Sequence, residues 1–191
     1  MRSTRLLALT LGTAAALTAC GTPTVTTSPD TAAQEAAISK PSAAESSATP
    51  AKKKAGVGDI ITLTGSEETL KVSVKVAKVI TKGAPANDMV KADAGKRLYG
   101  VELVLKVTGT ATYDDSPSNG AKVIDDEGQE YDASLFGEIA GTHKLNATTI
   151  APGDVRKGTL VFEVPTNAKI TRFQFALNSG FADQKGVWAV N

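Results

Sequence analysis

The chain has 191 residues, and its 21 Lys and Arg against 20 Asp and Glu give a formal net charge of +1 at pH 7. Nucleic-acid-binding proteins need a basic face, so this balance argues against a nucleic acid as a partner. A single cysteine and a single histidine argue against the common metal centres built from these residues, and we expect neither a metal nor another cofactor.

The N-terminal segment predicts export. Two arginines in MRSTR precede an apolar run of 14 residues, 6–19. A bilayer-spanning helix needs about 20 residues, whereas this length is typical of a signal peptide. Cys20 follows in the stretch LTAC, which resembles the lipobox of bacterial lipoproteins. The resemblance implies that residues 1–19 are a lipoprotein signal peptide and that Cys20 is diacylated, which anchors the mature chain to the membrane. An ordinary signal peptide followed by an unmodified cysteine is the alternative.

The lipidated cysteine and the residues after it, 20–56, are expected to form a disordered tether. Between residues 21 and 56, 24 of 36 residues are Ala, Thr, Ser or Pro, and none is aromatic. Such a composition cannot bury enough apolar surface to offset the entropy of ordering the chain. The three lysines at 52–54 are interpreted as a solvated stretch, with contact to anionic lipid or wall polymer as the alternative.

From Val57 onward, apolar residues alternate with polar ones at period two, which predicts half-buried strands. Eight strands are expected, at residues 60–64, 70–76, 97–107, 121–125, 129–133, 159–164, 172–177 and 186–190. The turn DDEGQ at 125–129 is expected to be a tight hairpin in which Gly128 takes a positive φ. Trp188 and Phe162 are the expected core anchors.

These strands predict the fold class. Parallel strands need helical crossovers, and no convincing helix is present, so the sheets are expected to be antiparallel. Residues 57–191 are therefore predicted to form one all-β, immunoglobulin-like sandwich of about eight strands, with a barrel as the alternative.

Three segments of this region resemble a known family. KRLYGVELVLKVTGT, KVIDDEGQEYDAS and IAPGDVRKGTLVFEVP follow one another within residues 95–177, and the last contains Gly158, Phe162 and Pro165. In order and spacing they are similar to a telokin-like, immunoglobulin-like domain family that is common in lipoproteins and secreted antigens of Gram-positive bacteria. The resemblance implies a β-sandwich on the cell surface, and it implies no shared catalytic activity and no catalytic residues.

The residues themselves also offer little catalytic chemistry. A serine or cysteine nucleophile needs a histidine base within reach. His143, in GTHKLNATT, is the only histidine, and no GxSxG-like frame accompanies it. We therefore expect a solvated loop histidine and no enzyme activity.

A run of carboxylates suggests a calcium site as an alternative. Hard oxygen ligands are what Ca²⁺ takes, but the spacing does not fit an EF-hand loop. Residues that favour turns beside a hairpin explain most of the run without an ion. Its members are Asp114, Asp115, Asp125, Asp126, Glu127, Glu130 and Asp132.

Two connections, 81–96 and 136–153, are longer than hairpins usually need, and loops of this length are commonly functional. Four apolar side chains in them are candidates for a contact patch, with the loop histidine as a further contact residue; packing back onto the sandwich is the alternative. The candidate interaction residues are Met89, Val90, Phe136, Ile139 and His143.

One strand also has a lysine stripe. Lys71, Lys75 and Lys78 are expected to project from a single exposed face. They are interpreted as a solvated face that protects a sheet edge from pairing with another chain.

Together these observations predict a lipid-anchored protein on the extracytoplasmic face of the cell membrane. Its immunoglobulin-like domain is expected to be a non-enzymatic interaction module for an envelope protein or a cell-wall polymer. The alternative is a carrier lipoprotein for a small ligand or Ca²⁺.

Overall fold

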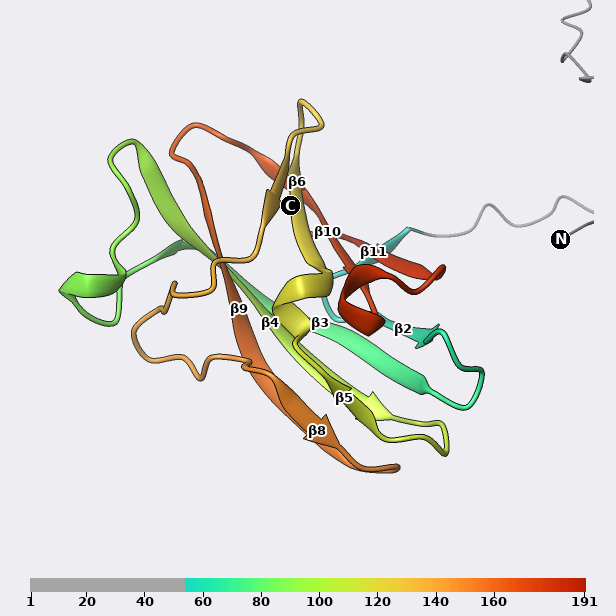
Figure 1. Cartoon of the computed structure of the whole chain (residues 1–191). Helices are drawn as coiled ribbons and strands as arrows, with labels where there is room; N and C mark the ends of the chain where they lie inside the picture. Colours follow the sequence, from blue (N-terminus) through green and yellow to red (C-terminus); the bar gives the residue numbers. More distant parts are fainter. Residues whose placement is uncertain (1–53) are drawn as a thin grey trace, which may run out of the picture. The chain divides into compact units, whose positions relative to one another are not determined.

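A computed structural model describes residues 54–191 (Figure 1). The predicted signal peptide, Cys20 and all but the last three residues of the predicted tether lie outside these residues. None of the helical turns within residues 54–191 has the length and apolar composition of a membrane span.

Two sheets pack face to face and form a β-sandwich. In spatial order, the five-stranded sheet consists of β1 (Ala55–Gly56), β11 (Lys185–Ala189), β10 (Ile170–Ala176), β6 (Ala121–Asp125) and β7 (Glu130–Asp132). The four-stranded sheet consists of β2 (Ile60–Thr64), β3 (Lys71–Gly83), β4 (Lys96–Val107) and β9 (Val155–Pro165). The predicted immunoglobulin-like sandwich class is confirmed.

A short ladder and three single turns of 3-10 helix complete the described fold. The strands β5 (Tyr113–Asp115) and β8 (Thr148–Ile150) pair with each other beside the four-stranded sheet (Figure 1). The turns are η1 (Asp88–Val90), η2 (Pro117–Gly120) and η3 (Asn178–Gly180).

Alternation along β4 determines which side chains enter the core. Val101, Leu103 and Leu105 are fully buried between the sheets, whereas the residues between them face outward. The register extends this pattern to both neighbours, because Leu103 lies opposite Val76 of β3 and opposite Gly158 of β9. The inner faces of all three strands therefore line one continuous core.

Aromatic side chains fill the centre of that core. The ring of Phe173 lies 5.8 Å from that of Trp188 and 6.3 Å from that of Phe162, measured between centroids. Trp188 and Phe162 are fully buried, as expected. The indole N–H of Trp188 donates to the backbone oxygen of Asp59 at 3.1 Å, which satisfies its one polar atom.

The structure differs from the sequence-based expectation in three respects. Ordered structure begins before the predicted boundary at Val57, because β1 pairs with β11. This pair is parallel, contrary to the expectation of purely antiparallel sheets; with only two residues it needs no helical crossover. The strands β5 and β8 were not expected, because three residues are too few to show a period. The second long connection therefore contains a strand.

Candidate functional site: two paired loops

The two long connections pair with each other. The loop between β3 and β4, residues 84–95, lies against the segment that joins β7 to β8, residues 133–147. Pro85 and Ile139 form an antiparallel bridge. On its two sides, the Ala86 N–H donates to the Glu138 oxygen at 3.1 Å, and the Ala140 N–H donates to the Ala84 oxygen at 2.9 Å. Two segments more than 50 residues apart thus form one structural unit at one end of the sandwich (Figure 1).

Ile139 anchors this unit to the sheet. Its side chain is only 3% exposed and packs with Leu98 and Val161 on the outer face of the four-stranded sheet. Two glycines provide the space for the Ile139 side chain. A Cβ on Gly83 would lie 2.4 Å from the Ile139 Cδ1, and a Cβ on Gly100 would lie 2.9 Å from it. The expectation that Ile139 contributes to an exposed contact patch is therefore wrong, because its side chain packs back onto the sandwich.

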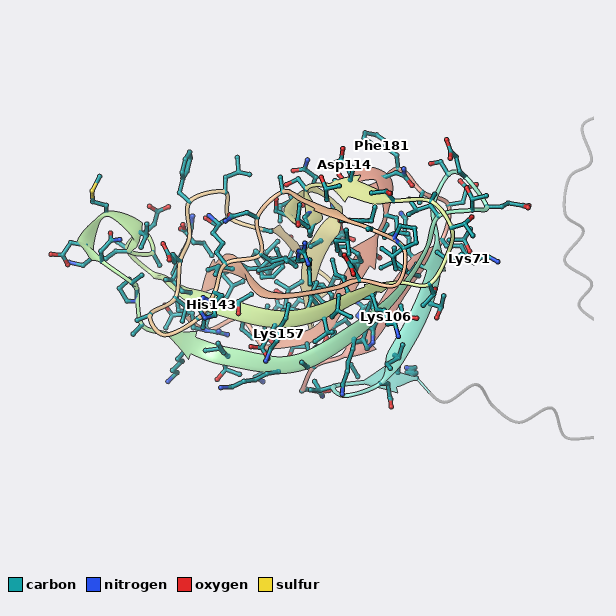
Figure 2. All side chains as sticks on the ribbon, turned by 90° about the horizontal axis from the view of Figure 1, so that it is seen from below. Lys71, Lys106, Asp114, His143, Lys157 and Phe181 are labelled. Carbon is teal, nitrogen blue, oxygen red and sulfur yellow. The ribbon has the colours of Figure 1, made fainter. Side chains whose placement is uncertain are left out.

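The other predicted loop residues remain accessible to different degrees. Met89, on η1, is 94% exposed, and Phe136 is 81% exposed. Val90 is half-buried, and His143 is exposed on the second loop, where its backbone oxygen accepts from the Thr159 N–H of β9 (Figure 2). Leu135, at 64% exposure, was missed although it directly precedes Phe136. The paired loops thus display large apolar side chains that the core does not use.

A basic depression of about 480 Å³ lies beside the first loop, but most of its cations already have partners. Lys91 pairs with Asp88 at 2.7 Å, and Lys96 pairs with Asp93 at 2.8 Å. The Arg97 guanidinium donates to the backbone oxygens of Thr81 and Ala168. These contacts hold the loop in place and leave little free charge for an anionic ligand.

A second, polar cleft lies under the other loop. It is lined by hydroxyl groups of Ser116, Ser118 and Ser134 and by Lys144. Thr159 also lines it, and its Oγ1 is buried without a hydrogen-bond partner among the described residues. The volume of about 120 Å³ is far below the roughly 300–1,000 Å³ of ligand pockets. Ordered water that satisfies the Thr159 hydroxyl fits this cleft better than a carried ligand.

The most buried member of the carboxylate run, Asp125, holds a turn together. Its Oδ1 accepts from the N–H groups of Glu127 at 3.0 Å and Gln129 at 2.8 Å. Its Oδ2 accepts from the Tyr131 hydroxyl at 2.8 Å. Burial raises the pKa of the Asp125 carboxyl, but these hydrogen bonds outweigh the burial and hold the pKa below its ordinary value. Gly128 has the expected positive φ, 87°.

Other carboxylates of the run also have local partners. Asp115 accepts from the Ser179 N–H and hydroxyl, both at 2.6 Å. Glu130 and Asp132 share Lys122, at 2.9 and 3.5 Å. Among residues 54–191, no group of three or more His, Cys, Asp or Glu side chains is placed to hold a metal ion. The geometry therefore gives the calcium alternative no site in this part of the chain.

One exposed aromatic residue was not predicted at all. Phe181 is 87% exposed beside η3, on the side of the sandwich where Asp114 also lies (Figure 2). The preceding Asn178 and Ser179 both have positive φ, 52° and 54°, and hydrogen bonds to Asp115 hold Ser179 there. In sequence, the motif NSGF is typical of an ordinary turn, so nothing in it predicted that the Phe181 ring is exposed.

Two sheets with a shared aromatic core and loops at one end define the class of small immunoglobulin-like β-sandwich modules. A family model described as "Domain of unknown function (DUF4352)" matches residues 64–186, and the chain belongs to this family. Among curated proteins, no match was found.

Solved structures share the fold at low sequence identity. The chain is similar to MPT63, a secreted protein from Mycobacterium tuberculosis, with a TM-score of 0.53 and 14% identity over 70% of this chain and 94% of that one. It is also similar to YcdA from Bacillus subtilis, named a putative lipoprotein, with a TM-score of 0.51 and 16% identity over 69% of this chain but only 38% of that one. A third similar structure, YjhA from Bacillus subtilis, has a TM-score of 0.50 and 12% identity over 72% and 99% of the two chains.

The anchoring role of Ile139 can be tested by truncation. We expect Ile139→Ala to lower the free energy of unfolding by about 2–5 kcal/mol, because it leaves a cavity under the loops. Hydrogen exchange should show faster exchange of the Ala86 and Ala140 amides, which form the loop pairing. Met89→Ala is the matched control, and its stability should stay within about 0.5 kcal/mol of the parent because the side chain is exposed. Unchanged exchange at both amides in the Ile139 variant would contradict the role.

The Asp125 turn predicts a pH dependence. A carboxyl with a lowered pKa in the folded state stabilises the protein above its unfolded pKa of about 3.9, and this stabilisation is lost as the pH falls through the lower folded pKa. Asp125→Asn should therefore be less stable than the parent at pH 7, and the difference should narrow below about pH 4. Denaturant unfolding across this range measures it. The neighbouring Asp126→Asn, whose carboxylate lies 3.8 Å from Lys169 near the surface, should show a much smaller effect at pH 7.

Proposed function

We propose that the chain is a membrane-anchored extracytoplasmic lipoprotein that presents a non-enzymatic immunoglobulin-like binding module to a protein or polymer of the cell envelope. The observation that carries the binding part is the pairing of the two long loops, which holds Met89 and Phe136 in exposed positions at one end of a rigid sandwich. Loops on such a scaffold are where β-sandwich domains commonly bind other molecules.

The anchoring part rests on sequence. The apolar segment 6–19 and the stretch LTAC before Gly21 have the length and residue types of a lipoprotein signal peptide. Of the similar structures, one is named a secreted protein and another a putative lipoprotein. Both names support an extracytoplasmic location. Two or three acyl chains on Cys20 would make release from the bilayer negligible.

The absence of enzyme activity is proposed on the chemistry of the titratable groups. His143 is exposed on a loop, and no described side chain hydrogen-bonds to its ring. The buried hydroxyl of Tyr99 has its pKa raised to about 12 by burial, with Arg97 opposing the shift. The buried hydroxyl of Tyr113 likewise has a raised pKa because of burial. Neither phenol is suited to proton transfer near neutral pH, since efficient general acids and bases have pKa values near the operating pH.

Removal of the thiol tests the anchor. We expect Cys20→Ala to carry no lipid and to accumulate as precursor or in the medium, because the acceptor for the acyl group is gone. Fractionation of the producing cells with intact-mass measurement checks this. A variant that stays in the membrane fraction at the normal mature mass would show that Cys20 is not the anchor.

Photocrosslinking in the producing cells tests the loops as the contact surface. A photoreactive amino acid at Met89 or Phe136 should yield a discrete crosslinked product, whereas the same group at Lys185 on β11 should not. The loop unit and β11 lie on opposite sides of the sandwich in Figure 1. The yield should also fall when Ile139→Ala releases the loops. No product from either loop position, or equal products from all three, would contradict the assignment.

A further inference from the structure

Five lysines gather on the outer face of the four-stranded sheet, which we call the lysine face. β3 contributes Lys71, Lys75 and Lys78, β4 contributes Lys106, and β9 contributes Lys157. Figure 2 shows Lys106 and Lys157 along the lower side of this sheet and Lys71 at its end, with Asp114 and Phe181 on the opposite side of the molecule. The stripe that was visible in sequence is thus one row of a two-dimensional array.

The sheet register places Lys106 at the centre of the array. Lys106 lies opposite Ser73, so Lys71 and Lys75 are its diagonal neighbours on β3. Lys157 lies opposite Val104, which makes it the diagonal neighbour on β9. Diagonal neighbours in a sheet are about 7–8 Å apart, so four ammonium groups repel one another on this surface.

Little negative charge compensates this array. Glu102 pairs with Lys157 at 3.1 Å, and it is the one carboxylate that the register places among these lysines. The other four lysines have no ion-pair partner within 4.0 Å among the described residues, whereas Lys122 on the other sheet has two. The described residues as a whole carry 16 Lys and Arg against 17 Asp and Glu, so the positive charge is a property of this face.

Edge protection does not account for Lys71, Lys75 and Lys106. The expectation from sequence was that the stripe on residues 71–78 guards a sheet edge. The structure places β3 between β2 and β4, so both edges of β3 are paired at Lys71 and Lys75, whereas the ladder with β2 ends at Lys75, before Lys78. The expectation of edge protection is therefore wrong for Lys71 and Lys75, whose like-charge repulsion guards no free edge.

We propose that the lysine face docks onto a membrane surface of anionic phospholipids. A two-dimensional array matches a planar charged surface, whereas a linear polyanion would be matched by a single row. Two apolar side chains on the same face support a lipid surface: Ile60, opposite Lys75, is 62% exposed, and Val155, opposite Lys106, is 46% exposed. Such side chains enter the headgroup region readily. Each lysine near an anionic bilayer strengthens binding by roughly fivefold.

This docking goes beyond the proposed function and does not depend on the anchor. In the anchored state the same membrane is tethered to the module, which makes docking an intramolecular event with a high effective concentration. The paired loops cover the other end of the same sheet face, where Ile139 packs on Leu98 and Val161, and the lysine array includes neither Met89 nor Phe136.

The test uses the mature chain, residues 20–191, with Cys20→Ser so that no acyl chain contributes. Co-sedimentation with vesicles that contain phosphatidylglycerol is compared with co-sedimentation with vesicles of phosphatidylcholine alone. We expect binding only to the anionic vesicles, weakened by added salt. Lys106→Glu should weaken it by roughly tenfold or more, because an attraction is replaced by a repulsion at the centre of the array. Lys185→Glu, with the same change of net charge on the other sheet, should change it by less than about twofold.

Stability separates a docking role from a structural one. Lys106→Glu places a carboxylate among Lys71, Lys75 and Lys157, so its thermal midpoint should equal or exceed that of the parent while its binding falls. Equal binding to both vesicle types, or equal weakening by Lys106→Glu and Lys185→Glu, would overturn the proposal. Binding to inorganic polyphosphate that depends on Lys106, without binding to vesicles, would overturn it in favour of a phosphate polymer. The anchor is tested separately by Cys20→Ala, so failure of one experiment is distinguishable from failure of the other.

Discussion

The outer face of β4 is the constraint on which both candidate surfaces depend. Because side chains alternate along a strand, the inward half of β4 forms the core and the outward half must be covered or solvated. At one end of β4, Leu98 and Gly100 face outward, and Ile139 covers them. At the other end Lys106 faces outward and stays exposed. The strand β4 thus holds the loop unit and the lysine face at opposite ends of one sheet face. Both surfaces are supported by the packed core beneath that strand.

The strands were predictable from sequence because the signal is local. Residues 97–107 alternate over a length that only a half-buried strand explains, and β4 covers Lys96–Val107. The same locality explains what was missed. The loop pairing joins segments more than 50 residues apart, and Ile139 has no periodic context that marks it as buried. Gly83 and Gly100 are the available signal, since each lacks the Cβ that would collide with Ile139. That signal becomes readable only when the register is known.

The carboxylate run is a second case in which closeness in sequence does not predict closeness in space. In sequence Asp114, Asp125 and Asp132 look like members of one acidic group. In the structure, Asp125 is buried under its own turn, whereas Asp132 is 81% exposed beside Lys122. Asp114 accepts from the Thr149 hydroxyl at 2.9 Å on a different ladder. These residues are close along the chain, but the fold places them on three different strands, β5, β6 and β7, so their carboxylates lie apart. A metal site requires convergence of oxygen atoms, and sequence spacing alone could not test that convergence.

The lysine face is the opposite case, because residues far apart in sequence lie close together in space. Its members look scattered in sequence, since Lys71, Lys106 and Lys157 lie on three different strands, and the register brings them together. The face is electrostatically unfavourable in isolation, because the register places no carboxylate among these lysines apart from Glu102. The repulsion between these lysines lowers the stability of the free module, and an external negative charge would relieve it. Binding surfaces commonly carry such a stability cost. The loop unit, by contrast, satisfies its charges internally through the Asp88 and Asp93 pairs and exposes apolar side chains instead. The two surfaces therefore differ in the kind of partner they suit: a planar anionic one for the sheet and a partly apolar one for the loops.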